Sequence, residues 1–96
     1  MKIIDEIYSE VLKAVSDMIE LPEGWMKSKR QDCTEARSLL VHYLIVKGMS
    51  RGQVGLKTGL SKTAIRNHAN NYNDRIKHNT MMRLYGEQIG RKLGAN

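Results

Sequence analysis

The chain has 96 residues, of which 41% are hydrophobic and five are aromatic, with no phenylalanine. A chain of this length forms one domain around one modest core, which leaves little room for the elaborate ligand pocket of a metabolic enzyme. The formal net charge is +6, but residues 1–26 carry two basic and six acidic side chains, whereas residues 27–96 carry fourteen basic and four acidic ones. Such asymmetry favours a basic face that meets a polyanion such as nucleic acid. A basic surface that serves only solubility would give the same charges.

The single cysteine, Cys33, excludes an intramolecular disulfide and fits a reducing compartment. No apolar run approaches the roughly 20 residues that span a bilayer. Acidic residues occur too early in the chain for a secretory signal. We therefore expect a cytoplasmic protein with no membrane contact.

The first predicted element is an amphipathic helix over residues 3–19, within an acidic N-terminal segment, 1–20. Apolar residues recur along it at steps of three and four and form one stripe. They are Ile4, Ile7, Val11, Val15 and Met18. Pro22 and Gly24 end this helix, and a basic stretch, Lys27–Arg30, leads to the next one.

A second helix is predicted from about Cys33 to Lys47, with Thr34 as its cap. Residues 39–46 are apolar almost all round, and this indicates a central helix that other elements surround. Gly48 follows in the position that favours a left-handed cap, so the helix ends there.

Two short helical patterns follow over residues 51–58 and 62–76, separated only by Gly59-Leu60-Ser61. A last helix is predicted over residues 79–93, where Met82, Tyr85, Ile89 and Leu93 have helical spacing. No segment alternates with a period of two, so we expect no strand. The predicted fold class is all-α, a single compact bundle of five to six helices.

Residues 50–76 have the features of a helix-turn-helix. Two short helices that cross steeply need a very small residue at the crossing, and Gly55 supplies it. The turn needs a positive φ angle, which Gly59 can adopt without steric cost. Ser61 can cap the second helix by accepting a hydrogen bond from the backbone N–H of residue 63 or 64. Three apolar anchors complete the pattern: Val54, Leu60 and Ile65. The alternative is an ordinary helical hairpin in which both glycines are accidental.

The second helix of this motif has two faces. The predicted buried stripe consists of Ile65, Ala69, Tyr72 and Ile76. The opposite face carries Lys62, Thr63, Arg66, Asn67 and Asn70. Arginine can bind guanine and asparagine can bind adenine through two hydrogen bonds each, so this face suits a reader of the DNA major groove. Any surface helix has a polar outer face, but the segment 51–77 contains only one acid, Asp74.

The three histidines and the cysteine have no metal-ligand spacing, so we expect no metal site. His42 lies in the apolar helix, where a structural, partly buried role is expected. His68 flanks the polar face and could donate to a phosphate or serve the structure. No catalytic triad, carboxylate cluster or phosphate-binding glycine loop is present, so we predict neither an enzyme nor a cofactor.

Three segments of the chain stand in a characteristic order: Ser28-Lys29-Arg30, then residues 35–44, which contain Ala36-Arg37 and Tyr43-Leu44, then residues 50–55, which contain Val54-Gly55. Together they resemble the C-terminal DNA-binding domain of the bacterial replication initiator DnaA, a helix-turn-helix that is more broadly similar to the Trp repressor. The resemblance covers most of the chain, from about residue 11 to residue 93.

This resemblance implies an all-α fold that binds double-stranded DNA. It places Arg30 in the minor groove and Lys62, Thr63 and Arg66 at the positions that contact the major groove. Gly55 would keep its packing role. The Arg-Asp-His triplet of that family is absent from this chain, so a different target sequence is implied.

The main hypothesis is therefore a sequence-specific DNA-binding protein, a small regulator of transcription or of a phage or mobile element. The residues expected to bind DNA are Lys29, Arg30, Arg51, Ser61, Lys62, Thr63, Arg66, Asn67 and Asn70. The alternative is a protein-interaction adaptor that uses the same scaffold, in which the acidic helix of segment 1–20 docks a partner or a second copy of the chain. Both roles could coexist.

Overall fold

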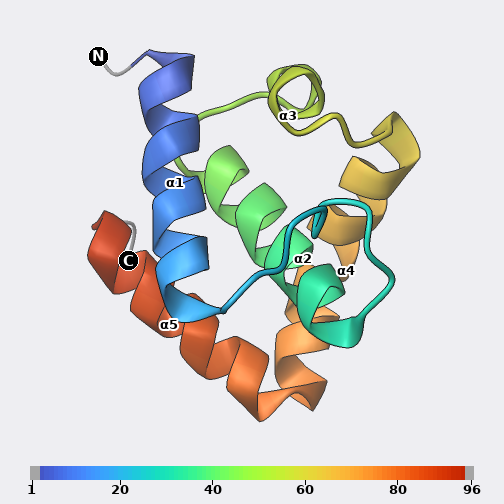
Figure 1. The fold of residues 1–96 in the computed structure, drawn as a ribbon. Helices are drawn as coiled ribbons and strands as arrows, with labels where there is room; N and C mark the ends of the chain where they lie inside the picture. Colours follow the sequence, from blue (N-terminus) through green and yellow to red (C-terminus); the bar gives the residue numbers. More distant parts are fainter. Residues whose placement is uncertain (1–2, 95–96) are drawn as a thin grey trace.

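Five α-helices make up most of the computed structural model, which describes residues 3–94 (Figure 1). They are α1 (Ile4–Met18), α2 (Gln31–Val46), α3 (Arg51–Thr58), α4 (Lys62–His78) and α5 (Thr80–Leu93). No strand occurs in this described part of the chain. The predicted all-α fold class is confirmed, with a helix count inside the predicted range. Residues 1–2 of the predicted segment 1–20 and residues 95–96 lie outside the described residues.

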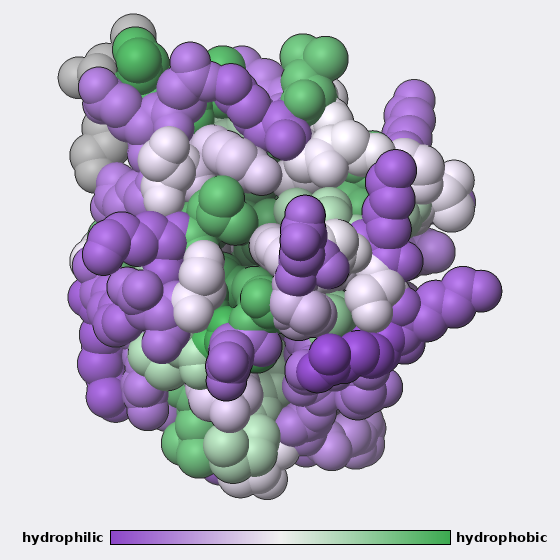
Figure 2. Space-filling model, in the orientation of Figure 1, coloured by the Kyte–Doolittle hydropathy of each residue, from purple (hydrophilic) through white to green (hydrophobic). Residues whose placement is uncertain are grey.

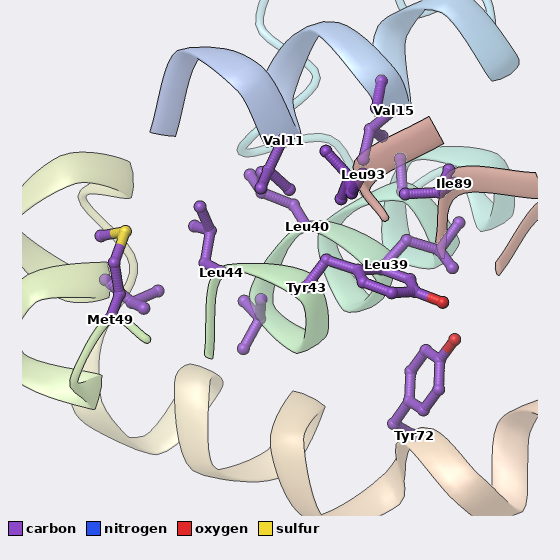
Figure 3. Close-up of a cluster of buried hydrophobic side chains, with 14 of the residues drawn as sticks. Val11, Val15, Leu39, Leu40, Tyr43, Leu44, Met49, Tyr72, Ile89 and Leu93 are labelled. Carbon is purple, nitrogen blue, oxygen red and sulfur yellow. The ribbon is translucent and has the colours of Figure 1, made fainter. Parts of the chain in front are cut away.

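Helix α2 lies at the centre of the fold and contacts each of the other four helices. Several of its side chains are completely inaccessible to solvent: Leu39, Leu40, Val41 and Leu44. Figure 3 shows side chains of α1 and α5 gathered around this part of α2. Burying one such side chain contributes about 1.5–3 kcal/mol, so this helix dominates the hydrophobic stabilisation. The predicted central helix is confirmed.

The helices α1 and α5 lie side by side and cover α2 (Figure 1). The predicted apolar stripes face inward on both of them. In α1 the buried members are Ile7, Val11 and Val15, and in α5 they are Met82, Ile89 and Leu93. The ends of the α1 stripe, Ile4 and Met18, and Tyr85 in α5 are half-buried and pack against the same core. Helical periodicity therefore predicted both inner faces correctly.

The start of α2 differs from the prediction by two residues, and the predicted cap is wrong. The N-cap residue is Arg30, and the hydroxyl group of Thr34 donates a hydrogen bond to the Arg30 carbonyl (3.1 Å) instead of accepting one from a backbone N–H. The carboxylate of Asp32 accepts from the backbone N–H of Cys33 (2.9 Å). A negative charge in the first turn also interacts favourably with the helix dipole, so Asp32 allows the helix to begin earlier.

Two tyrosines connect α2, α4 and α5. The hydroxyl group of Tyr43 donates to the carbonyl of Gly86 (2.6 Å), and the hydroxyl groups of Tyr43 and Tyr72 point toward each other (Figure 3). A Cβ atom on residue 86 would lie 2.6 Å from the Tyr72 hydroxyl oxygen, so any larger residue there would force Tyr72 to shift. On its other side, the Tyr72 ring stacks on His42 with 3.7 Å between the ring centroids. These contacts fix the inner face of α4 and leave its outer face free.

Candidate nucleic-acid interface

Side-chain caps define both helices of the α3–α4 pair. Helix α3 begins with a capping box, in which the Ser50 hydroxyl accepts from the Gln53 N–H (3.2 Å) and the Gln53 side chain accepts from the Ser50 N–H (2.9 Å). It ends at Gly59, whose φ angle is 75°. The Ser61 hydroxyl then accepts from the Ala64 N–H (3.1 Å) and caps α4. The predicted roles of Gly59 and Ser61 are therefore confirmed.

Gly55 lies where α3 and α4 approach each other. A Cβ atom there would be 3.3 Å from Ile65 Cδ1 and 3.6 Å from the Leu60 carbonyl oxygen. The first distance is tighter than an ordinary van der Waals contact, so a Cβ atom at residue 55 would require the Ile65 side chain to shift by a few tenths of an ångström. Of the three predicted anchors, Val54 and Ile65 are buried, whereas Leu60 is only half-buried. A glycine thus lies where the two helices approach each other, as predicted.

The two predicted faces of α4 are present. Ile65 and Tyr72 are buried and Ala69 and Ile76 are half-buried, so this stripe faces the core. The predicted DNA-contacting residues of α4 are all exposed: Lys62, Thr63, Arg66, Asn67 and Asn70. Figure 2 shows long hydrophilic side chains projecting from the side of the molecule on which α4 lies. This face can offer several hydrogen-bond donors and acceptors to a ligand.

A groove lies between α3 and the beginning of α4. It is lined by Arg51, Gly52, Gly55, Leu60, Lys62, Thr63, Ile65 and Arg66. Three of these residues are cations and none is acidic, so the groove suits a negatively charged ligand. A guanidinium N–H of Arg51 also donates to the side-chain carbonyl of Asn70 (3.5 Å), which links the groove to the outer face of α4.

The sequence patterns did not identify Gly52 as a member of this site. The signal for it was present, because two glycines three residues apart are unusual within an eight-residue helix. The packing distinguishes the two glycines, because a Cβ atom would be crowded at Gly55 and not at Gly52.

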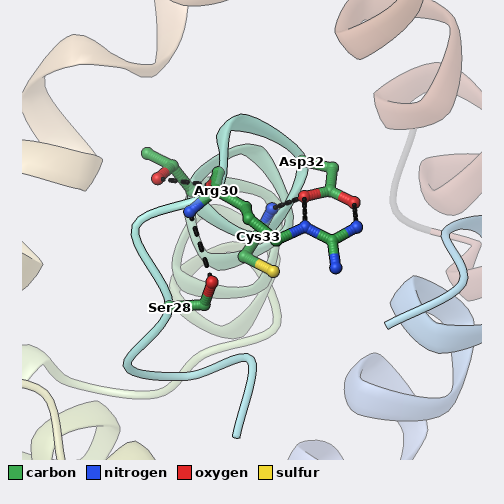
Figure 4. A network of polar contacts seen from close by, with 5 residues as sticks. Ser28, Arg30, Asp32 and Cys33 are labelled. Carbon is green, nitrogen blue, oxygen red and sulfur yellow. Dashed lines mark hydrogen bonds and ion pairs between the residues drawn. The ribbon is translucent and has the colours of Figure 1, made fainter. Parts of the chain in front are cut away.

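The basic loop before α2 carries the exposed residues Lys29 and Arg30. The Arg30 guanidinium group is not free, because it forms a two-pronged ion pair with the Asp32 carboxylate at 2.7 and 3.2 Å (Figure 4). Its backbone N–H donates to the Ser28 hydroxyl (3.2 Å). Desolvation raises the pKa of the Asp32 carboxyl group, but hydrogen bonds from Arg30 and Cys33 and the positive charge of Arg30 lower it. The pKa of Asp32 is therefore below its usual value.

Arg37 of α2 holds the chain that precedes this loop. Its guanidinium group donates to the Trp25 carbonyl (2.7 Å) and to the Thr34 hydroxyl (3.2 Å). Its positive charge also acts on His68 in α4. The turn at Trp25 is therefore attached to the part of α2 that faces α4.

His68 is 8% exposed, so its ring lies inside the protein and not on the outer face of α4. Its Nδ1 atom lies 2.7 Å from the hydroxyl oxygen of Ser38, another buried polar residue. Burial, together with the positive charges of Arg75 and Arg37, lowers the pKa of His68 to about 4. The ring is therefore neutral at pH 7. Of its two predicted roles, the structure supports the structural one.

The described residues also bear on metals and membranes. Within residues 3–94, no three His, Cys, Asp or Glu side chains gather closely enough to hold a metal ion. In the same part of the chain, no helix combines the length and apolar character that crossing a membrane requires.

The predicted site residues thus fall into two groups. The first group belongs to the α3–α4 pair: Arg51 in α3, Ser61 at the N-cap of α4 and the five exposed residues of α4. The second group, Lys29 and Arg30, lies on the loop before α2. Comparisons with models of protein families, with curated proteins and with solved structures found no match.

Proposed function

We propose that the protein binds double-stranded DNA in a sequence-specific manner, with the α3–α4 pair acting as a helix-turn-helix. The observation that carries this proposal is the outer face of α4, where exposed amides and cations stand beside a groove with three cations and no acid. A helix of this kind fits the major groove of B-DNA, where each base pair presents its own pattern of donors and acceptors.

The exposed residues have different parts in this proposal. Arg66, Asn67 and Asn70 contact base edges, because their planar groups can form paired hydrogen bonds. Lys62 and Arg51 neutralise phosphates on either side and set the register of the helix in the groove. Ser61 keeps a hydroxyl proton that can be donated to a phosphate, since its oxygen alone serves the cap.

The loop before α2 supplies a second contact. Its exposed cations, Lys29 and Arg30, are suited to the backbone or the narrow minor groove, where the potential is strongly negative. The resemblance to the initiator domain favours a minor-groove position for Arg30. A small regulator of transcription or of a phage or mobile element is the biological role that fits such a protein.

The adaptor alternative has less support. Acidic residues of α1 form ion pairs within the chain: Asp5 with Lys57, Glu10 with Lys47 and Asp17 with Lys13 and Lys92. The exposed large apolar side chains are scattered over α3, α5 and the ends of α1 and α2: Ile3, Val46, Leu56, Met81 and Leu84. Scattered apolar residues do not mark a docking surface.

Selection of bound duplexes from a random-sequence pool tests the proposal. The wild type should enrich one short motif and bind it with nanomolar affinity. Arg66→Ala should still bind DNA but lose its preference at one position of that motif, because a good bidentate contact contributes about 1–3 kcal/mol of discrimination.

Arg91→Ala is the matched control, because it removes the same charge from an exposed position on α5. It should leave the motif unchanged. Failure of the wild type to enrich any motif, even at low salt, would contradict the proposal. Purification with a stable protein partner in that case would favour the adaptor.

A further inference from the structure

Helix α3 contains two glycines, and only one of them is explained by packing. Glycine inside a helix is less favourable than alanine, because it loses more backbone freedom on folding. Gly55 lies against Ile65, where a Cβ atom would be crowded. At Gly52, a Cβ atom would meet only the Ser50 hydroxyl oxygen, at 3.9 Å, and the backbone has no positive φ angle. The fold would therefore accept alanine at position 52.

The surroundings of Gly52 indicate why a side chain is missing there. Gly52 is exposed and lines the groove between α3 and α4. Three cations line the same groove, namely Arg51, Lys62 and Arg66, and no lining residue carries a negative charge. The missing side chain leaves the backbone of α3 open to an approaching ligand, and glycine is typical of positions where another chain comes close to the backbone.

We propose that Gly52 is a close-approach residue, against which one sugar–phosphate strand of DNA lies in the groove between α3 and α4. This inference rests on the proposed DNA-binding function. The three cations of the groove favour a polyanionic strand as its ligand. A side chain at residue 52 would hold the strand away from Arg51 and Lys62, the two groove cations assigned to phosphates, and charge-assisted hydrogen bonds are short, at about 2.7–2.9 Å.

The substitutions Gly52→Ala and Gly52→Gln test this position, because stability and binding should change in opposite directions. The G52A protein should unfold about 3 °C higher than the wild type, since alanine favours the helix. It should bind DNA about tenfold more weakly, and G52Q should bind more weakly still because its side chain is larger. Affinity is measured on the selected duplex and on a random-sequence duplex.

The affinities of G52A and G52Q for the two duplexes should fall by a similar factor, because contacts to the sugar–phosphate strand carry no sequence information. The affinity of Arg66→Ala should instead fall more for the selected duplex than for the random-sequence duplex. Leu56→Ala is the matched control on α3, because Leu56 is 87% exposed and does not line the groove. Its DNA affinity should equal that of the wild type.

The outcomes separate this inference from the function on which it rests. If the wild type binds neither duplex at low salt, the proposed function and the inference both fail. If the wild type binds and G52A binds equally well, only the inference is overturned. A G52A protein that is less stable than the wild type would also overturn it, because glycine would then be required by the fold.

Discussion

At the scale of single residues, the Ser38–His68 pair makes a sharp prediction about pH. The folded-state pKa of His68 is about 4, below the ordinary value of 6.5. The unfolded chain therefore takes up a proton more readily than the folded one. The free energy of unfolding should fall as the pH falls from 6.5 toward 4, by about 3 kcal/mol from this residue, and above pH 6.5 this contribution should be constant.

Urea unfolding at pH 7.5 and pH 4.5 measures this effect in the wild type and in His68→Gln. The variant should lose less stability on acidification than the wild type. Part of the fall should persist, because burial also lowers the pKa of His42. Equal losses in both proteins would show that His68 is not a neutral buried group.

The Arg30–Asp32 ion pair makes a second prediction at this scale. The side chains are 61% and 38% exposed, so breaking the pair has little effect on stability, but it frees the arginine for DNA. Asp32→Asn should raise DNA affinity by about two- to fivefold at low salt, the factor expected for a surface pair.

Asp17→Asn in α1 provides the control, because it removes the same charge from a helix outside the candidate interface. It should raise affinity less than Asp32→Asn does. An unchanged or lower affinity in the Asp32 variant would mean that the ion pair holds Arg30 ready for binding.

At the scale of helices, the α2–α4–α5 junction determines how α4 is presented. A Cβ atom on residue 86 would lie 2.6 Å from the Tyr72 hydroxyl oxygen but 3.9 Å from the ring carbon that bears it. Gly86→Ala should therefore destabilise the protein by about 1–3 kcal/mol through overpacking. In a Tyr72→Phe background the same change should be close to neutral, because the crowded oxygen is gone and alanine favours the helix.

Thermal or urea unfolding of the four proteins in this double-mutant cycle gives the coupling between the two residues. If the Gly86–Tyr72 contact is the cause, the coupling free energy should be at least about 1 kcal/mol. Additive effects would mean that Gly86 is needed for a reason other than its contact with Tyr72.

Local signals explain why the five helices and much of the candidate interface could be predicted from the sequence. The apolar periodicity of α1 and α5, the crowded crossing at Gly55 and the turn at Gly59 each depend on residues close in the chain. Interactions between distant residues gave no such signal: Ser38 meets His68 thirty residues away, and the Tyr43 hydroxyl meets Gly86 forty-three residues away. The groove beside Gly52 likewise depends on how α3 packs against α4. The Arg30–Asp32 ion pair is local, but opposite charges two residues apart do not by themselves predict an ion pair.

At the scale of the whole molecule, the acidic and basic residues lie mainly in different parts of the chain, but several ion pairs join the two parts. The acidic helix α1 packs against α2 and α5. Its acids form ion pairs with Lys47 at the end of α2, Lys57 in α3 and Lys92 in α5. The groove contains no acid, and the outer face of α4 contains one, the exposed Asp74 in the C-terminal half of the helix. DNA binding should therefore weaken steeply as salt rises, because each neutralised phosphate releases counterions.

The ratio between the affinities for the selected duplex and for a duplex with the same bases in permuted order tests the central claim most directly. If the outer face of α4 reads bases, this ratio should reach at least about 10³ at physiological salt, and both affinities should fall with salt. Arg66→Ala should reduce the ratio, and Arg91→Ala should not. Equal affinities for the two duplexes would contradict the claim that this protein recognises a DNA sequence.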